Sequence, residues 1–199
     1  MSKRGVFICV EGIDGSGKTT HARRLVENLR RKGFDAVYTT EPTSGEIGKF
    51  IRTRILQSRE RVPSIIEALL FAVDRIEHVE NVIKPALQEG KIVVSDRYIY
   101  SSLAYQGATG LNLRWIEEIN RFAISPDLAI YIDIPAEVVF ERLRRDKSVM
   151  ENFQTQCKVR EVYLKLVEDG KLVLISGNRP TSEVEKDIFA TVLRFIEKH

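Results

Sequence analysis

The chain has 199 residues, with 31 lysines and arginines against 28 aspartates and glutamates, so its net charge is 31 − 28 = +3. Domains usually run to roughly 100 to 200 residues, so this length predicts one domain with a core of its own. An apolar share of 43% beside a charged share of 30% excludes a wholly disordered chain and a protein with several membrane spans. Because basic and acidic residues are interleaved, we expect no nucleic-acid polymer as partner.

The N-terminal segment and the cysteines carry little sign of export. The apolar stretch from Val6 to Val10 is too short for a signal-peptide core or a membrane span. Cys9 and Cys157 lie far apart, and their spacing permits a structural disulfide without suggesting one. We therefore expect a cytoplasmic protein that has no membrane partner.

Short apolar runs alternate with longer segments of helical periodicity along the chain. This alternation predicts an α/β fold with a parallel sheet and helices on both faces. The expected strands are Val6–Val10, Ala36–Thr40, Ile92–Ser95, Leu128–Ile134 and Leu172–Ile175. The expected helices are Lys18–Lys32, Ile47–Gln57, Ser64–Gln88, Leu113–Phe122, Ala136–Arg145, Asn152–Glu168 and Glu183–Glu197. In such a sheet, ligands bind at the carboxyl ends of the strands.

Three helix boundaries have a physical reason. Gly33 follows three basic residues, and glycine tolerates the left-handed backbone that ends many helices. Pro85 lacks a backbone N–H, so the long third helix should kink or restart there. Thr181 precedes an acidic first turn and is the expected N-cap of the last helix.

The segment from Gly12 to Thr19 fits the pattern G-x-x-x-x-G-K-[ST] at every fixed position, between an apolar strand and a helix. In that setting, glycines let backbone N–H groups surround phosphate oxygens, and the helix N-terminus adds a favourable field. Lys18 would reach the β- and γ-phosphates, and the Thr19 hydroxyl would bind Mg²⁺. The expected ATP-binding residues here are Gly12, Asp14, Gly15, Ser16, Gly17, Lys18, Thr19 and Thr20. A glycine-rich turn without a ligand is the alternative.

The loop alone does not separate kinases, motor ATPases and GTPases. A GTPase should carry an N-K-x-D segment that reads guanine, and the nearest sequence, Asn178-Arg179-Pro180-Thr181, lacks the lysine and the aspartate. A nucleotide-dependent switch is therefore the weaker interpretation.

A second anion site is expected after the strand Ile92–Ser95, where Asp96 and Arg97 follow. A carboxylate at this position can hold a metal ion beside the phosphate loop, and the arginine next to it can bind another phosphate. A surface ion pair between Asp96 and Arg97 is the alternative.

The ordered motifs resemble those of the thymidylate kinase family, whose members phosphorylate dTMP to dTDP. The motifs are Glu11-Gly12-Ile13-Asp14, Glu41-Pro42, Leu70-Phe71-Ala72-Val73-Asp74-Arg75, Asp96-Arg97-Tyr98 and Ser101-Ser102-Leu103-Ala104-Tyr105-Gln106-Gly107. The resemblance spans nearly the whole chain. It implies the three-layer P-loop fold of nucleoside-monophosphate kinases, with a five-stranded parallel sheet, one domain over residues 1–199 and a short lid at about 142–152.

The resemblance also implies how the acceptor nucleotide is bound. Phe71 would stack on thymine, and Arg75, one helical turn further on, would bond to a thymine carbonyl. Tyr105 would lie against the sugar and disfavour a 2′-hydroxyl. The substrate-binding residues implied in this way are Glu11, Glu41, Arg52, Phe71, Arg75, Arg97, Ser101, Ser102, Tyr105 and Gln106. From the residues alone, core packing is the preferred interpretation of Phe71, and Arg52 could equally be a solvated helix residue.

The catalytic residues implied by the resemblance lie around the two phosphates. Asp14 would lie near the deoxyribose 3′-hydroxyl and the metal, and Arg97 would contact the acceptor phosphate. Asp96 joins Thr19 as the expected metal-binding pair.

A cationic clamp is expected from a lid, because Gly15 stands where some family members carry an arginine in the phosphate loop. The expected lid contains the basic segment Arg142–Lys147. In this segment, Arg145 and Lys147 are the expected catalytic cations, and Arg142 would stack on adenine. The family's D-R-x-E signature is reduced here to Ser148-Val149-Met150-Glu151. For each basic residue, a solvated helix face is the alternative.

Together these features predict a kinase that transfers the γ-phosphoryl group of ATP to dTMP with Mg²⁺ as cofactor. The resemblance implies a homodimer. The alternatives are a deoxynucleoside kinase or a monophosphate kinase of broad specificity, and a P-loop switch that binds a protein partner.

Overall fold

The sheet has the architecture that the sequence predicts. The computed structural model describes residues 4–58, 62–143 and 153–198. Its five strands run in the order β2-β3-β1-β4-β5, and every neighbouring pair is parallel. The strands are β1 (Val6–Glu11), β2 (Ala36–Thr40), β3 (Ile92–Asp96), β4 (Leu128–Asp133) and β5 (Val173–Ser176). The predicted α/β fold with a five-stranded parallel sheet is confirmed, and each expected strand lies within two residues of the observed one.

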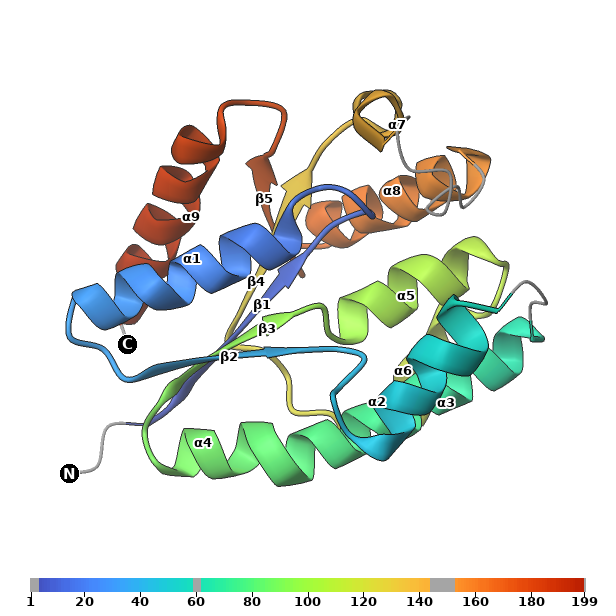
Figure 1. The fold of residues 1–199 in the computed structure, drawn as a ribbon, viewed down its shortest axis with the longest axis horizontal. Helices are drawn as coiled ribbons and strands as arrows, with labels where there is room; N and C mark the ends of the chain where they lie inside the picture. Colours follow the sequence, from blue (N-terminus) through green and yellow to red (C-terminus); the bar gives the residue numbers. More distant parts are fainter. Residues whose placement is uncertain (1–3, 59–61, 144–152, 199) are drawn as a thin grey trace.

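Helices cover both faces of this sheet (Figure 1). Helices α1 and α9 pack on one face, and α4 and α8 pack on the other, where α5 lies against α8. The α-helices are α1 (Lys18–Arg31), α2 (Glu46–Phe50), α3 (Ser64–His78), α4 (Lys84–Gln88), α5 (Ile99–Ala108), α6 (Leu113–Ile119), α7 (Ala136–Leu143), α8 (Phe153–Glu168) and α9 (Thr181–Ile196). Two π-helical segments, Ile51–Leu56 and Val79–Ile83, extend α2 and join α3 to α4.

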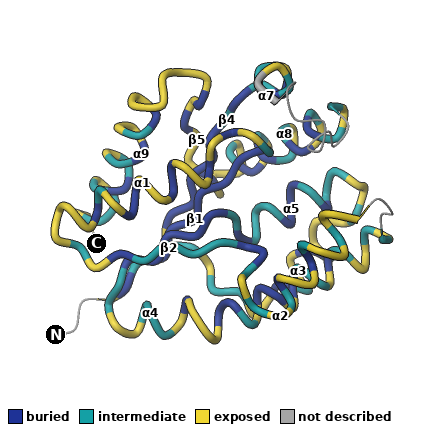
Figure 2. Tube along the Cα trace, in the orientation of Figure 1, coloured by how far each residue is buried: buried dark blue, intermediate teal, exposed yellow. Residues whose placement is uncertain are grey.

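The core lies in the central strands, which are buried from both sides (Figure 2). Residues Phe7 to Val10 of β1 are completely inaccessible to solvent, as are Val93 and Val94 of β3. Strands buried on both faces have continuous apolar runs in their sequence, and for this reason the strands could be predicted within two residues. Cys9 and Cys157 are free thiols, so no disulfide joins them. In the described parts of the chain, no helix combines the length and apolarity that a membrane crossing needs.

Helix α5 was not expected from the sequence. Its residues do not segregate into an apolar and a polar side, because α3, α6 and α8 all contact it. Polar Ser102 and Gln106 are as buried as Leu103 and Ala104. A helix enclosed in this way lacks the one-sided apolar stripe by which helices are recognised.

Two of the three predicted helix boundaries are confirmed. Gly33 follows α1 with φ of 89°, and its N–H donates to the Arg30 carbonyl. Pro85 stands in the first turn of α4, directly after the π-helical segment, so the long helix restarts there. The expectation for Thr181 is wrong, because it is the first residue of α9 and makes no capping bond with its side chain.

The loop after β2 is held close to the carboxyl ends of the strands. Fully buried Asp74 of α3 accepts hydrogen bonds from the Thr43 N–H at 2.9 Å and the Thr43 hydroxyl at 2.6 Å. Gly48 of α2 packs against the main chain of Thr43 so closely that a Cβ at this position would overlap it. Glycine at position 48 therefore allows the loop to lie this close to α2.

Replacing Gly48 by alanine should lower the free energy of unfolding by about 1 to 3 kcal/mol, because the added methyl group forces α2 away from the loop. Chemical denaturation measures this change. Lys49→Ala, on the exposed side of the same helix, is the control and should change stability by less than about 0.5 kcal/mol. Equal stability of the two variants would contradict the packing described.

Candidate active site

The loop between β1 and α1 has the backbone that a phosphate cradle needs. Gly15 and Gly17 have φ of 77° and 84°, and a Cβ on Gly12 would lie 2.5 Å from the Ser16 hydroxyl oxygen. The N-terminus of α1 receives no side-chain cap from the described residues. Its first N–H groups are therefore available to an anion. Thr20 follows Thr19 in this exposed first turn.

Lys18 is folded back against this loop. Its Nζ donates to the Ile13 carbonyl at 2.8 Å and lies 4.0 Å from an Asp14 carboxylate oxygen. Burial, assisted by the neighbouring Arg97 charge, lowers the pKa of Lys18 to about 8. A polyphosphate in the cradle would supply the negative charge that this buried ammonium lacks.

Thr19 and Asp96 form a site that suits a magnesium ion. The Thr19 hydroxyl donates to Asp96 Oδ2 at 2.5 Å, and Asp96 Oδ1 is buried without a partner among the described residues. In the described parts of the chain, no three or more His, Cys, Asp or Glu side chains are grouped so that they could hold a metal ion by themselves. One carboxylate and one hydroxyl, completed by phosphates and water, is a set of ligands that Mg²⁺ accepts. The residues present therefore fit this ion.

A pocket opens beside the phosphate loop, between α3 and α5. It is lined by Asp14, Glu41, Pro42, Leu56, Glu67, Phe71, Arg75, Arg97, Ser101, Ser102, Tyr105 and Gln106. Most of the residues predicted to bind substrate are thus brought together in one place. Phe71 is half-buried and lines the pocket, so it is not an ordinary core residue.

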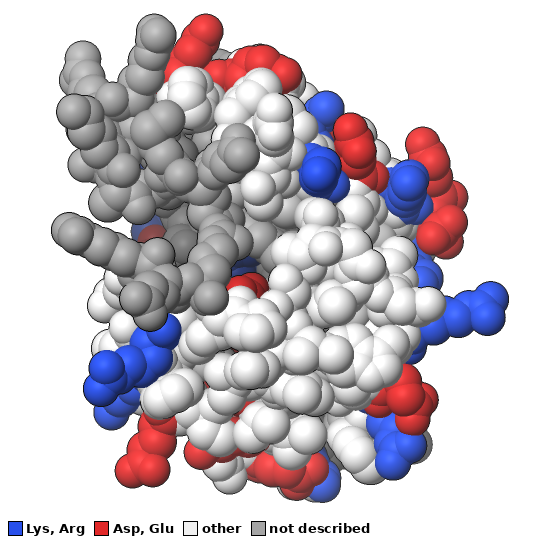
Figure 3. Space-filling model, turned by 90° about the vertical axis from the view of Figure 1, so that its right-hand side faces the viewer, with Lys and Arg blue, Asp and Glu red and all other residues white. Residues whose placement is uncertain are grey.

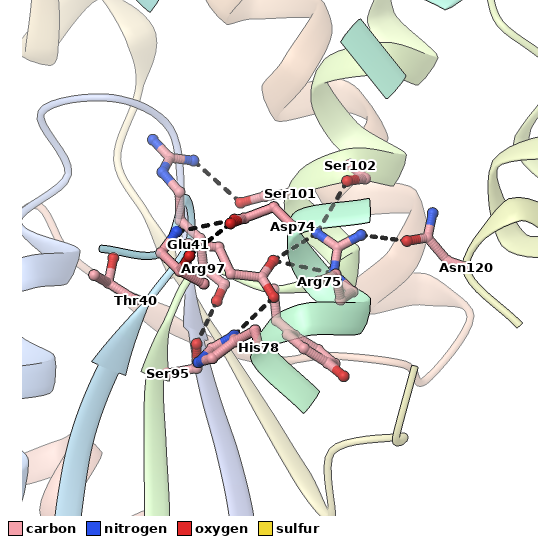
Figure 4. A network of polar contacts seen from close by, with 12 residues as sticks. Thr40, Glu41, Asp74, Arg75, His78, Ser95, Arg97, Ser101, Ser102 and Asn120 are labelled. Carbon is pink, nitrogen blue, oxygen red and sulfur yellow. Dashed lines mark hydrogen bonds and ion pairs between the residues drawn. The ribbon is translucent and has the colours of Figure 1, made fainter. Parts of the chain in front are cut away.

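Arg75 is held at the base of this pocket by a buried polar network (Figure 4). Its Nε and Nη2 donate to Glu41 Oε2 at 3.0 and 2.6 Å, Nη2 also donates to the Ser102 hydroxyl at 3.1 Å, and Nη1 donates to Asn120. Arg75 is 1% exposed. It is therefore a fixed donor rather than a solvated helix residue.

Arg97 links the pocket to the phosphate loop. Its backbone has φ of 70°, and two hydrogen bonds hold it there: Arg97 N–H to the Val10 carbonyl at 3.0 Å, and the Ser95 hydroxyl to the Arg97 carbonyl at 2.6 Å. The guanidinium lies 5.0 Å from the centre of the Tyr105 ring and pairs with Asp14. Arg97 pairs with the phosphate loop, so the predicted alternative of a surface pair with Asp96 is wrong.

The Asp14 carboxylate lies between two cations. Burial acts to raise the pKa of Asp14, but the Arg97 and Lys18 charges outweigh it and hold the pKa below its usual range. Asp14 therefore stays ionised at neutral pH. One carboxylate thus restrains both positive groups.

Glu11 and Arg52 lie outside the pocket lining. Glu11 is fully buried and accepts from the Tyr98 N–H at 2.9 Å, the Ser101 hydroxyl at 2.6 Å and the Tyr163 hydroxyl at 2.9 Å. Arg52 is half-buried and donates to the carbonyls of Pro42 and Thr43. Both support the walls of the pocket: Glu11 at the start of α5, and Arg52 at the loop after β2.

The lid residues are only partly described. Arg142 lies on α7, but its side chain is not described, and Arg145 and Lys147 fall outside the described residues. Their predicted roles stay predictions.

Several residues of the site were missed in the sequence. Glu67 precedes Phe71 by four residues as Arg75 follows it by four, so the spacing along α3 could have revealed it. Leu56 of the lining, and Asn120 and Gln156, which contact Arg75 and Asp14, carry no such signal. Only the tertiary fold brings them to the site.

Comparison with known proteins agrees with the motifs. The family model for thymidylate kinase matches residues 10–188. A probable thymidylate kinase of Pyrococcus abyssi is 48% identical, covering 95% of this chain and 96% of the relative. That of Thermococcus onnurineus is 45% identical, covering 94% and 97%. A thymidylate kinase of Halothermothrix orenii is 38% identical, covering 95% and 97%.

The chain belongs to the thymidylate kinase family. The resemblance seen in the motifs is thereby confirmed, as is the P-loop kinase fold that it implied. The pocket between α3 and α5 is lined by residues of the motifs, among them Glu41-Pro42, Leu70 to Arg75 and Ser101 to Gly107.

Nucleotide binding should change the protonation of Lys18. At pH 8 the free enzyme holds about half a proton on this group, and a bound polyphosphate raises its pKa, so about half a proton is taken up per nucleotide. Calorimetry of Mg·ADP binding in buffers of different ionisation enthalpy measures this uptake. Lys18→Arg keeps a permanent charge and should take up none. Equal uptake by both proteins would contradict the assignment to Lys18.

Proposed function

We propose that this protein transfers the γ-phosphoryl group of ATP to the 5′-phosphate of dTMP, giving dTDP and ADP. One observation carries the proposal: Lys18 of the phosphate loop and Arg97 of the pocket flank the same carboxylate, that of Asp14. A phosphate at each cation would therefore lie next to the other. Two bound phosphates in this relation need no protein nucleophile, because in-line transfer depends on position and charge.

The donor half is the phosphate loop with its metal pair. The loop N–H groups and Lys18 would hold the β- and γ-phosphates, with Thr19 and Asp96 holding Mg²⁺. When bound, Mg²⁺ neutralises charge on the phosphate oxygens. The Asp14 carboxylate, which lies against both Lys18 and Arg97, offsets the repulsion between these two cations.

The acceptor half offers hydrogen bonds that suit thymine. The guanidinium of Arg75 has five N–H groups, and four are bound by Glu41, Ser102 and Asn120, which leaves one on Nη1. Gln106 donates to Glu67 at 2.9 Å, and its Oε1 is buried with no partner among the described residues. One donor and one acceptor match the carbonyl and N–H of the thymine edge, whereas cytosine offers the reverse pattern.

The whole chain would act as one kinase unit. Residues at about 142–152 would form the lid, with Arg145 and Lys147 supplying the clamping charge and Arg142 stacking on adenine. The match to relatives over nearly their full length supports a single kinase unit.

The proposal is tested by following ADP formation with dTMP, dUMP, dCMP, dAMP, dGMP and thymidine offered separately. We expect dTMP to give the highest kcat/KM. Equal rates with all monophosphates would favour the broad-specificity alternative, and a preference for thymidine would favour a deoxynucleoside kinase. ATP hydrolysis at a rate that does not depend on the acceptor would favour the P-loop switch that binds a protein partner.

Arg75→Ala should raise the KM for dTMP by the equivalent of about 1.5 to 3 kcal/mol, because a charged hydrogen bond to the base is lost. The KM for ATP should hardly change, which also shows that the variant is folded. Arg121→Ala, an exposed arginine, is the matched control. An unchanged KM for dTMP would show that Arg75 does not bind the base.

Asp96→Asn should raise the Mg²⁺ concentration needed for half-maximal activity at least about tenfold, because the Thr19–Asp96 pair loses its charged ligand. Titration of Mg²⁺ at saturating nucleotides measures the shift. Asp169→Asn, on the surface after α8, should leave the titration unchanged. A normal titration for Asp96→Asn would make Asp96 purely structural.

We propose a homodimer formed through α3. Ile65, Leu69, Val73 and Ile76 follow one another at helical spacing and are 48%, 44%, 47% and 39% exposed. The opposite side of the same helix carries Glu67, Phe71 and Arg75 into the pocket. An apolar stripe of this kind on a folded chain indicates a protein partner, and a second copy is the simplest closed arrangement.

Leu69→Glu should weaken this dimer at least about a hundredfold, because the two copies place like charges opposite each other. Sedimentation velocity across a range of concentrations measures the dissociation. Val173→Glu, an exposed apolar residue on β5, should leave the dimer intact. A monomeric wild-type protein, or a dimeric Leu69→Glu variant, would contradict this interface.

The remaining expectations are a cytoplasmic location and no nucleic-acid polymer as partner. On the face shown in Figure 3, lysines and arginines alternate with acidic residues around a broad uncharged area. The described residues of this face form no continuous basic stripe of the kind that a polyanion needs. This charge distribution supports a small-molecule substrate.

A further inference from the structure

A fully buried histidine lies behind the base-reading arginine. His78 ends α3, one turn after Arg75, and is 1% exposed. Its Nδ1 lies 3.0 Å from Glu41 Oε1, and its Nε2 lies 2.6 Å from the Thr39 hydroxyl oxygen. Both ring nitrogens are thus used, and neither faces the pocket.

The two oxygens of Glu41 have different partners. Oε2 accepts both hydrogen bonds from Arg75, and Oε1 faces His78. Figure 4 shows the carboxylate between the guanidinium and the imidazole. Glu41 is 4% exposed, and a buried carboxylate oxygen needs a donor, which the His78 Nδ1–H supplies.

The Thr39 hydroxyl completes this series of hydrogen bonds on the other side of the imidazole. With Nδ1–H directed at the carboxylate, Nε2 lies against the Thr39 hydroxyl oxygen, and this hydroxyl can serve the ring as donor or as acceptor. Thr39 and Glu41 are two residues apart at the end of β2, and Arg75 and His78 are three apart on α3. These hydrogen bonds therefore hold the carboxyl end of β2 against one face of α3.

We propose that His78 is a positioning residue for recognition of the acceptor base. Its Nδ1–H holds Oε1 of Glu41, which leaves Oε2 to fix the guanidinium of Arg75 with one N–H directed at the base. His78 acts through Glu41 and Arg75 and does not touch the nucleotide. The inference rests on the proposed use of Arg75 as a base reader.

Two substitutions of His78 test the roles of its two ring nitrogens separately. The side-chain amide of asparagine occupies the place of Nδ1, whereas that of glutamine extends to the place of Nε2. His78→Asn should keep the hydrogen bond to Glu41 and leave the KM for dTMP within about threefold of wild type. His78→Gln should raise it roughly tenfold, with little change in the KM for ATP. The same rise in both variants, or a rise in neither, would overturn the proposal.

A double-mutant cycle distinguishes positioning from a general loss of structure. In an Arg75→Ala background, His78→Gln should no longer change the KM for dTMP, because the group that it positions is absent. An undiminished effect in that background would overturn the role. If His78→Gln does not fold, Thr39→Val takes its place, with Thr39→Ser as control, and a rise of roughly threefold for valine alone is expected. A wild-type protein that does not phosphorylate dTMP would instead refute the proposed function itself.

Discussion

The buried ion pair between Arg75 and Glu41 is the interaction around which the acceptor pocket is built. Its nitrogen and oxygen lie 2.6 Å apart, and the two side chains are 1% and 2% exposed. Removing both charges from water costs several kcal/mol for each ion, and the pair is tolerated only when further hydrogen bonds satisfy it. Asn120, Ser102 and His78 provide those bonds. One interaction therefore ties α3, α5, α6 and the end of β2 together, and the pocket lies where they meet.

A second shared group joins this pocket to the phosphate loop. Asp14 belongs to the loop by sequence and to the pocket by position, and it lies against both Lys18 and Arg97. The separation of the two cations is thus set before any nucleotide binds. Phosphoryl transfer depends on placing charge correctly rather than on forming a covalent intermediate, so a preset pair of cations is the arrangement that the reaction needs.

The sequence revealed the parts of the molecule that local chemistry dictates. The phosphate loop was readable because Gly12, Gly15 and Gly17 meet a backbone requirement, and the strands were readable because they are apolar on both faces. Helix α5 was missed because neighbours enclose it on several sides. His78 and Asn120 were missed because their partners come from distant parts of the chain. Residue spacing within one helix or strand cannot predict such contacts. The family resemblance supplied Phe71 and Arg75, which periodicity alone would have assigned to the core and to the solvent.

In the pocket proposed here, the charge of Glu41 organises base recognition without touching the donor half. Calorimetric binding of dTMP to wild type and to Glu41→Gln tests it directly, with binding of a magnesium-bound, non-hydrolysable ATP analogue as the internal reference. The substitution keeps the shape of the side chain but removes the charge that holds Arg75. We expect dTMP affinity to fall at least about tenfold while the ATP analogue binds as before. Unchanged dTMP affinity, or an equal loss for both ligands, would contradict it.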